Sequence, residues 1–315
     1  MRAAVVTELG QPPSSGELPE PSPGEGEVVL EVLAAPLNPL DVAVSTGAFY
    51  GGHPELPFVP GAEGVGRVRD SGDVVWAFGG GLGMSRNGSM AELAVVPEQR
   101  LVPVPAGADP VVAAALGIAG VAGWLPLAWR VPVRKGETVL VLGATGTVGL
   151  VAVQAARLLG AGRIVAAGRS EEGLARAQEV GADAVVRLGD RFRDDLREAV
   201  GDDGLTLIFD PLWGEPLVGA LDVAAPGARI VHLGQSAGPT ASLESGTVRG
   251  KQLELFGYSN FAVPMDVLRR EYDRLVRHAE AGEIRIDVEQ IPLEDVATAW
   301  ERQQRGEHIK LVLVP

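Results

Sequence analysis

A glycine-rich turn at residues 143–149 has the residue types that bind a nucleotide pyrophosphate. It reads Gly-Ala-Thr-Gly-Thr-Val-Gly and follows residues 138–142, which are apolar or β-branched and indicate a buried strand. The apolar periodicity after the turn predicts a helix from about Val148 to Leu159. Strand, glycine turn and helix in this order form a dinucleotide cradle, because glycine permits close backbone approach and the helix N-terminus offers free N–H groups. The predicted cradle residues are Gly143, Ala144, Thr145, Gly146, Thr147 and Val148.

The end of the next strand bears on which nucleotide is bound. A fold selective for NAD places an acidic residue there, about twenty residues after the turn, to hold the ribose 2′-hydroxyl. Here the strand ends in Gly168, Arg169 and Ser170. A guanidinium and a hydroxyl suit a 2′-phosphate, so we predict NADPH as the cofactor. In the alternative, Arg169 is a solvated surface residue and Glu171 reaches the ribose.

Other polar side chains are candidates for contact with the nicotinamide or the substrate. Asn38 either hydrogen-bonds the nicotinamide ribose or a substrate carbonyl, or it forms an Asn-Pro turn. Tyr50 either donates a hydrogen bond in the substrate pocket or is a loop aromatic, and Asp41 is typical of a helix cap. Gly234 ends a strand, at the edge where parallel sheets bind ligands.

Composition excludes several classes of protein and site. The chain has no cysteine, which excludes disulfides, thiolate catalysis and cysteine zinc sites. Its four histidines lie too far apart in the sequence for a local metal motif. A net charge of −14 argues against a nucleic-acid partner and against an anionic membrane surface. Residues 110–129 carry no charge, but their glycines and Pro126 favour a buried connecting helix, and we expect a soluble cytoplasmic protein.

The elements that must position these residues fall into two groups. Residues 1–104 alternate short strands with proline-rich loops, which is typical of a partly closed β-barrel, and residues 11–27 are expected to be an unpacked loop. From Glu137 onward, six apolar strands alternate with helices, which predicts a doubly wound parallel sheet with all its strands buried. An amphipathic helix over 263–281, a short helix over 294–306 and an apolar strand over 309–315 complete the chain. We expect the last strand to return to the N-terminal domain.

The order of several motifs resembles the medium-chain dehydrogenase/reductase superfamily, specifically its zinc-free quinone oxidoreductase branch. The resemblance covers essentially the whole chain and rests on residues 38–41, 60–66, 72–75, 88–92, 143–149, 181–183, Asp210 and 310–314. It implies an α/β fold: a six-stranded Rossmann domain over 116–263 and a β-rich, GroES-like domain formed by 1–115 and 264–315. It also implies a homodimer formed through the edge of the nucleotide-domain sheet.

The resemblance extends to individual residues. It places Tyr258 and Lys310 near the cofactor, and it implies an apolar substrate pocket lined by Tyr50, Trp124, Tyr258 and Phe261. Core packing, or for Lys310 a solvated strand end, is the alternative role for these side chains. Zinc-dependent relatives have a cysteine where Asn38 stands and a histidine where Ala62 stands, so a zinc-activated alkoxide is not expected here. Leu188 departs from the family, since many members have a tyrosine at that position.

The resulting hypothesis is an NADPH-dependent, zinc-independent oxidoreductase. It would transfer hydride from nicotinamide C4 to a quinone or an α,β-unsaturated carbonyl, and Asn38 or Tyr50 would stabilise the developing oxyanion. One alternative is a metal-free alcohol dehydrogenase in which Tyr50 or His53 acts as acid and base. Another is a non-catalytic protein that binds NADPH, such as a redox sensor.

Overall fold

The computed structural model describes residues 1–315, which form two compact units. The first unit contains residues 1–119, 263–281 and 286–315. The second contains residues 120–262 and 282–285.

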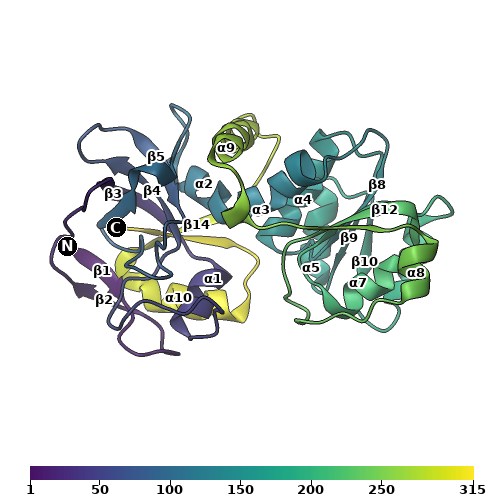
Figure 1. Cartoon of the computed structure of the whole chain (residues 1–315), viewed down its shortest axis with the longest axis horizontal. Helices are drawn as coiled ribbons and strands as arrows, with labels where there is room; N and C mark the ends of the chain where they lie inside the picture. The colour runs from purple at the N-terminus through teal and green to yellow at the C-terminus, as the bar shows by residue number, and fades with distance from the viewer. The chain divides into compact units, whose positions relative to one another are not determined.

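The second unit is built on a six-stranded sheet in which every neighbouring pair of strands is parallel. The strand order is β10-β9-β8-β11-β12-β13, so it reverses between β8 and β11. Figure 1 labels β8, β9, β10 and β12 of this sheet. This arrangement confirms the predicted doubly wound Rossmann sheet. The strands are β8 (Thr138–Leu142), β9 (Arg163–Gly168), β10 (Ala184–Arg187), β11 (Leu205–Asp210), β12 (Ala224–His232) and β13 (Glu254–Gly257).

Helices connect these strands and cover the sheet. They are α3 (Val121–Leu125), α4 (Thr147–Leu158), α5 (Glu171–Glu179), α6 (Phe192–Val200), α7 (Gly214–Leu221) and α8 (Ser245–Gly250). Alternate strand residues such as Leu140, Ile208 and Ile230 form one apolar cluster with side chains of α6 and α7. Residues of the opposite parity, such as Val139 and Val141, are also fully buried. Burial of both faces explains why the central strands are continuous apolar runs.

The edge strand β13 corrects one prediction. We expected all six strands to be buried, yet three of the four β13 residues are exposed, and Leu255 has 51% of its surface accessible. The physical reason is position: β13 pairs with β12 alone, so one side of it has no neighbour within the chain. An apolar run in the sequence does not reveal whether its strand is central or at an edge.

The first unit contains a seven-stranded sheet of mixed direction, which matches the expected β-rich, GroES-like architecture. Strands β14, β15, β3, β4, β5 and β7 lie in this order, and β6 also pairs with β3. The strands are β3 (Glu27–Pro36), β4 (Glu63–Val68), β5 (Val74–Phe78), β6 (Leu93–Pro97), β7 (Leu101–Pro103), β14 (Val288–Pro292) and β15 (Lys310–Val314). Because β15 pairs with β3, the predicted return of the C-terminal strand to the N-terminal domain is confirmed.

Two short strands in this unit were not expected. The proline-rich segment 11–27 contains β2 (Ser14–Glu17), which pairs with β1 (Arg2–Val5), and β14 pairs with β15. Backbone hydrogen bonding to a neighbour forms β2, whose side chains are mostly exposed, so it carries no apolar pattern. The helices of the unit are α1 (Pro39–Ser45), α2 (Pro110–Ala115), α9 (Met265–Glu280) and α10 (Val296–Arg305).

The uncharged segment after residue 109 forms a long helical stretch, Pro110–Arg130, with an irregular backbone. It is long and apolar enough to cross a membrane, yet 78% of its most apolar window is buried inside the protein. α2 ends at Ala115, and Gly117 then leaves the helical conformation with φ −58° and ψ −116°. Directly after this break, the backbone N–H of Ile118 donates a hydrogen bond to the Glu63 carboxylate.

Candidate functional site

The turn between β8 and α4 has the geometry of an anion cradle. Gly143 adopts φ +64°, a left-handed conformation that favours glycine, and α4 begins after Gly146. No side chain caps α4 at Gly146, so the first backbone N–H groups of the helix have no side-chain acceptor. An uncapped helix N-terminus at the carboxyl end of the first strand of the sheet suits a pyrophosphate.

The glycines of this turn serve different purposes. A Cβ added to Gly146 would meet no atom within 4 Å, so this position faces open space. A Cβ on Gly149 would overlap the carbonyl oxygen of Gly143, so Gly149 is required for the close packing of α4 on the turn. Gly146 is therefore the glycine whose side-chain space a ligand can use.

Thr145 uses its side chain for packing. The residue is 8% exposed, and a Cβ on Gly168 or on Gly173 would overlap or crowd its side chain. Both glycines thus make room for Thr145 at the start of α5. Of the predicted cofactor residues, Gly168 has this packing reason in the structure, and the Thr145 side chain packs between the two glycines.

The residues that follow β9 differ in their contacts. The Ser170 hydroxyl caps α5, since it accepts a hydrogen bond from Gly173 N at 3.1 Å. Arg169 is exposed. Glu171 pairs with Arg187 at 3.2 Å, and Arg187 lies opposite Gly168 in the β10–β9 register. Two arginines therefore lie at the tip of β9, and of the two acids in the first turn of α5, Glu171 is paired with Arg187.

The carboxyl ends of β11 and β12 place two further polar groups side by side. Asp210 is fully buried, and its Oδ1 accepts hydrogen bonds from the backbone N–H groups of Leu212 and Trp213 at 3.0 and 2.9 Å. Its Oδ2 lies 3.0 Å from His232 Nδ1. Gly234 follows, and a Cβ there would lie 2.7 Å from Pro211 O. The sequence indicated Asp210 and Gly234 as strand-end residues, but it gave no sign that His232 pairs with Asp210.

The predicted pocket aromatics have unequal environments. Tyr50 is 94% exposed, and its ring contacts only its neighbour Phe49 among the aromatic residues, at 4.6 Å between centroids. The Tyr258 hydroxyl donates to Asn260 Oδ1 at 2.7 Å, and burial raises the pKa of Tyr258 well above its ordinary value. Trp124 is buried in α3, whereas Phe261 is 41% exposed. Tyr50 is thus accessible to solvent and to ligands, while the Tyr258 proton is held within the chain.

Asn38 lies inside a buried polar network of the first unit and is 2% exposed. Its Nδ2 donates to Glu63 Oε1 at 2.8 Å and to Pro36 O at 3.3 Å. Its Oδ1 accepts from Lys310 Nζ at 2.6 Å. A carboxamide has two N–H hydrogens, so both are taken. While these bonds persist, Asn38 has no amide hydrogen left for the nicotinamide ribose or a substrate carbonyl, and its predicted role there stays a prediction.

Asp41 and Glu63 are the carboxylates of this network. Asp41 accepts from Asn38 N at the start of α1 and from Ala62 N, both at 2.8 Å, which confirms its predicted role as a cap. Glu63 is fully buried, and its Oε2 accepts from Trp76 Nε1 at 2.7 Å and from Ile118 N at 2.6 Å. Ile118 directly follows Gly117, where the backbone of the long helix is irregular. The sequence showed Glu63 only as part of a motif and gave no indication of these contacts.

Burial sets the electrostatics of the network. It raises the pKa of Glu63 to about 7 and that of Asp41 to about 6, although nearby donors and Lys310 oppose both shifts. It lowers the pKa of Lys310, which Glu63 and Asp41 counteract. The carboxylates therefore favour the charged form of a lysine that is only 4% exposed.

Lys310 retains hydrogen-bonding capacity. Its ammonium donates to Leu37 O at 2.8 Å and to Asn38 Oδ1. Since an ammonium has three hydrogens, one donor remains for another acceptor. Lys310 is thus the buried cation of the network, and its two bonds use two of its three hydrogens.

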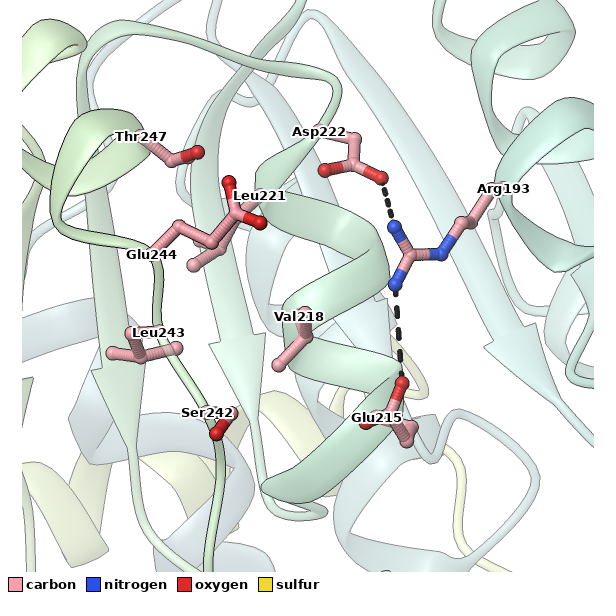
Figure 2. Close-up of a pocket in the computed structure, with 9 residues that line it drawn as sticks. All are labelled: Arg193, Glu215, Val218, Leu221, Asp222, Ser242, Leu243, Glu244 and Thr247. Carbon is pink, nitrogen blue, oxygen red and sulfur yellow. Dashed lines mark hydrogen bonds and ion pairs between the residues drawn. The ribbon is translucent and has the colours of Figure 1, made fainter.

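A pocket of about 460 Å³ lies elsewhere in the second unit, along α7 (Figure 2). Arg193 reaches toward Asp222 and Glu215, and Glu244 adds a third carboxylate to the lining. The one cation is therefore paired and acids predominate, which disfavours a nucleotide phosphate. The pocket includes none of the predicted cofactor or substrate residues. In the chain as a whole, no group of three or more His, Asp or Glu side chains is arranged to hold a metal ion.

Comparison with known proteins gives consistent matches over both units. Residues 24–106 match the family model of the alcohol dehydrogenase GroES-like domain, and residues 147–279 match that of zinc-binding dehydrogenases. The chain is 28% identical to the human quinone oxidoreductase, over 97% of this chain and 94% of the relative. It is 32% identical to the rat quinone oxidoreductase-like protein 2, over 81% of this chain and 74% of the relative. The structure of a mycobacterial quinone oxidoreductase superposes with a TM-score of 0.86 at 26% identity and covers both chains completely.

Proposed function

Because this chain belongs to the medium-chain dehydrogenase/reductase superfamily, in its quinone oxidoreductase-like branch, we propose that it reduces a quinone or an α,β-unsaturated carbonyl with NADPH and without zinc. Membership supports the general class, an oxidoreductase with a nicotinamide cofactor. The observation that carries the proposal is the uncapped N-terminus of α4 behind Gly146, whose side-chain space is open. The residues present fit a dinucleotide pyrophosphate there.

The preference for NADPH rests on the tip of β9. Arg169 is exposed and Arg187 lies opposite Gly168, while the nearest acid, Glu171, pairs with Arg187. The acid that stands nearest in the sequence is therefore engaged by an arginine, and a guanidinium is available for a 2′-phosphate. Ser170 can add its hydroxyl hydrogen, because it uses only an oxygen lone pair to cap α5.

When bound, the nicotinamide would supply a hydride from C4 to the acceptor carbon. The acceptor oxygen then gains negative charge, which a preorganised donor stabilises. We assign that role to Tyr50 or to the third hydrogen of the Lys310 ammonium, since both Asn38 amide hydrogens are taken. The proposed contacts of the cofactor and of the substrate pocket also include Gly234, Tyr258, Trp124 and Phe261. A proton from water or Tyr50 completes the reduction to a hydroquinone or a saturated carbonyl.

The absence of zinc from this proposal follows from the ligands present. An amide at Asn38 and a methyl group at Ala62 stand where zinc-dependent relatives carry a thiolate and an imidazole. The Asn38 amide is also engaged by Glu63 and Lys310. We further propose a cytoplasmic location, since the one helix apolar enough to cross a membrane is mostly buried. We also propose that the substrate is a small molecule.

The test is oxidation of NADPH, followed at 340 nm, against a panel of quinones, enones and alcohol–ketone pairs, with and without EDTA. We expect turnover with quinones or enones that EDTA leaves unchanged. Turnover restricted to alcohols and ketones would favour a metal-free alcohol dehydrogenase. Tight NADPH binding without turnover of any acceptor would favour a sensor.

A further inference from the structure

The hydrogen bonds around Glu63 run in one fixed direction. Both ends of the chain of bonds are groups that can only donate: the Lys310 ammonium at one end, and the Trp76 indole and Ile118 backbone N–H at the other. Asn38 lies between Lys310 and Glu63. Its oxygen accepts from Lys310 and its nitrogen donates to Glu63, so every hydrogen bond in the series points toward the Glu63 carboxylate. Only a group that accepts from every side can close such a chain. A carboxylate does so, and a carboxamide does not.

Glu63 also holds the backbone at the break in the long helix. A Cβ on Gly117 would overlap Glu63 Oε2, so only glycine allows the carboxylate to reach Ile118 N. The carboxylate thereby accepts from the backbone directly after the irregular residue Gly117. On its other side, the Trp76 ring stacks on Tyr272 at 4.6 Å, and the Tyr272 hydroxyl donates to Ala113 O in α2.

From these contacts we propose that Glu63 is the positioning residue of the candidate site. Its carboxylate fixes the orientation of the Asn38 amide, keeps Lys310 as a cation with one hydrogen for a ligand, and holds the helix at Gly117. The proposal rests on the proposed function to the extent that Asn38 and Lys310 serve hydride transfer. It assigns Glu63 no contact with cofactor or substrate.

The titratable groups around Glu63 are Lys310, Tyr272 and, beyond Asn38, Asp41. Lys310 lies on β15, Asp41 on α1 and Tyr272 on α9, and each is buried. With a pKa of about 7, Glu63 loses part of its charge as the pH falls below neutrality, while Asp41 follows near 6. Protonation weakens the acceptor and the counter-charge of Lys310 together, so activity should fall toward acid pH.

The first experiment compares Glu63→Gln with wild type and with Glu289→Gln, which makes the same change in the same unit at a partly exposed residue paired with Arg302. At pH 8 we expect kcat/KM for NADPH-dependent reduction to fall roughly 10- to 100-fold in Glu63→Gln, the range for hydrogen bonds to charged groups. It should change less than about twofold in Glu289→Gln. Wild type should lose activity through pH 7, and Glu63→Gln should lack that acid limb. An unchanged limb near pH 7 in Glu63→Gln would overturn the proposal.

The second experiment needs no activity. In Glu63→Gln, two donors must face each other somewhere in the network. The new amide nitrogen faces Asn38 Nδ2 or the N–H groups of Trp76 and Ile118, or, if the Asn38 amide turns over, the Asn38 nitrogen faces Lys310. Replacing Lys310 by Gln as well provides an acceptor for the turned Asn38 amide and removes this conflict. We therefore expect Glu63→Gln and Lys310→Gln each to lower the urea midpoint of unfolding, and the double variant to unfold at a higher urea concentration than the two single losses added together would give. If the decreases in the urea midpoint in the two single variants add up to the decrease in the double variant, the proposed direction of the hydrogen bonds is wrong. If wild type turns over no acceptor, the proposed function fails. The comparison of the two single variants with the double variant still decides the role of Glu63.

Discussion

Arg169 and Ser170 follow the same strand, β9, yet their side chains have different tasks. Ser170 caps α5 through its oxygen, while Arg169 is exposed beside the start of the helix. The serine is therefore tied to the stability of α5, and the arginine is free for a ligand. Replacing Arg169 should therefore change nucleotide binding, whereas replacing Ser170 should also change the stability of the fold.

Replacing Arg169 by Ala should weaken NADPH binding by about 1.5 kcal/mol, the low end of the range for hydrogen bonds to charged groups, because the residue is exposed. NADH binding should barely change, since NADH has no phosphate at this position. Isothermal titration of both nucleotides gives the ratio of dissociation constants that decides the matter. Ser170→Ala, which removes a cap as well as a proposed phosphate contact, should also lower the free energy of unfolding by about 1 kcal/mol. Equal losses for NADPH and NADH in Arg169→Ala would mean that the arginine supports the fold instead.

The turn between β8 and α4 shows how one element separates folding from binding. Gly149 is needed so that the helix can pack on the turn, whereas Gly146 leaves open space in front of the helix N-terminus. The backbone of Gly146, at φ −94° and ψ 168°, is accessible to any residue. The same substitution should therefore mainly impair dinucleotide binding at Gly146 and mainly reduce the stability of the fold at Gly149.

We expect Gly146→Val to abolish measurable dinucleotide binding, because the branched side chain fills the cradle, at a cost of about 1 kcal/mol or less in stability. Gly149→Val should cost about 3 kcal/mol in stability, because its Cβ meets backbone atoms that cannot move away. Chemical denaturation and fluorescence titration with NADPH measure the two effects. Retained affinity in Gly146→Val would show that the pyrophosphate binds elsewhere.

At the scale of the whole molecule, two features lead to predictions: the types of metal-ligating residue in the chain and the exposed edge of its parallel sheet. It has no cysteine, and none of its acidic and histidine side chains gather into a metal site. Its Rossmann-type sheet ends at β13, where Leu255 is half exposed on a strand with one free side. An open edge of this kind can pair with another chain.

Purified protein should contain well under one zinc per chain by elemental analysis, because Asn38 and Ala62 supply no thiolate or imidazole. Prolonged dialysis against EDTA should leave both the unfolding midpoint and the turnover unchanged. One tightly held zinc per chain would require a ligand set that neither the sequence nor the structure indicates.

If the chain forms the dimer that the family resemblance implies, its mass by sedimentation should be that of two chains, and Leu255→Lys should shift it toward one chain. The charge would be buried in the new strand pair without a partner. Leu158→Lys provides the control, since Leu158 is an exposed leucine on α4 of the same unit. A monomeric wild type, or dissociation by both variants alike, would exclude the β13 edge as the interface.

The sequence by itself determined what depends on neighbours along the chain. The strand, glycine turn and helix at 138–158 are contiguous, so their burial pattern and φ requirements can be seen in the sequence. The cap formed by Asp41 is equally local, three residues from Asn38. Alternation of apolar strands and helices predicted the parallel sheet, because crossover connections impose that order.

Only the tertiary structure decided which partner each buried polar group has. Asn38 and Glu63 are 25 residues apart, and Asn38 and Lys310 are 272 residues apart, so no spacing rule connects them. From the sequence, Asn38 was a candidate donor to a substrate; in the fold, both of its hydrogens are committed. The physical reason is that a buried polar group must find its partner inside the protein, and which partner is within reach depends on how distant strands are paired.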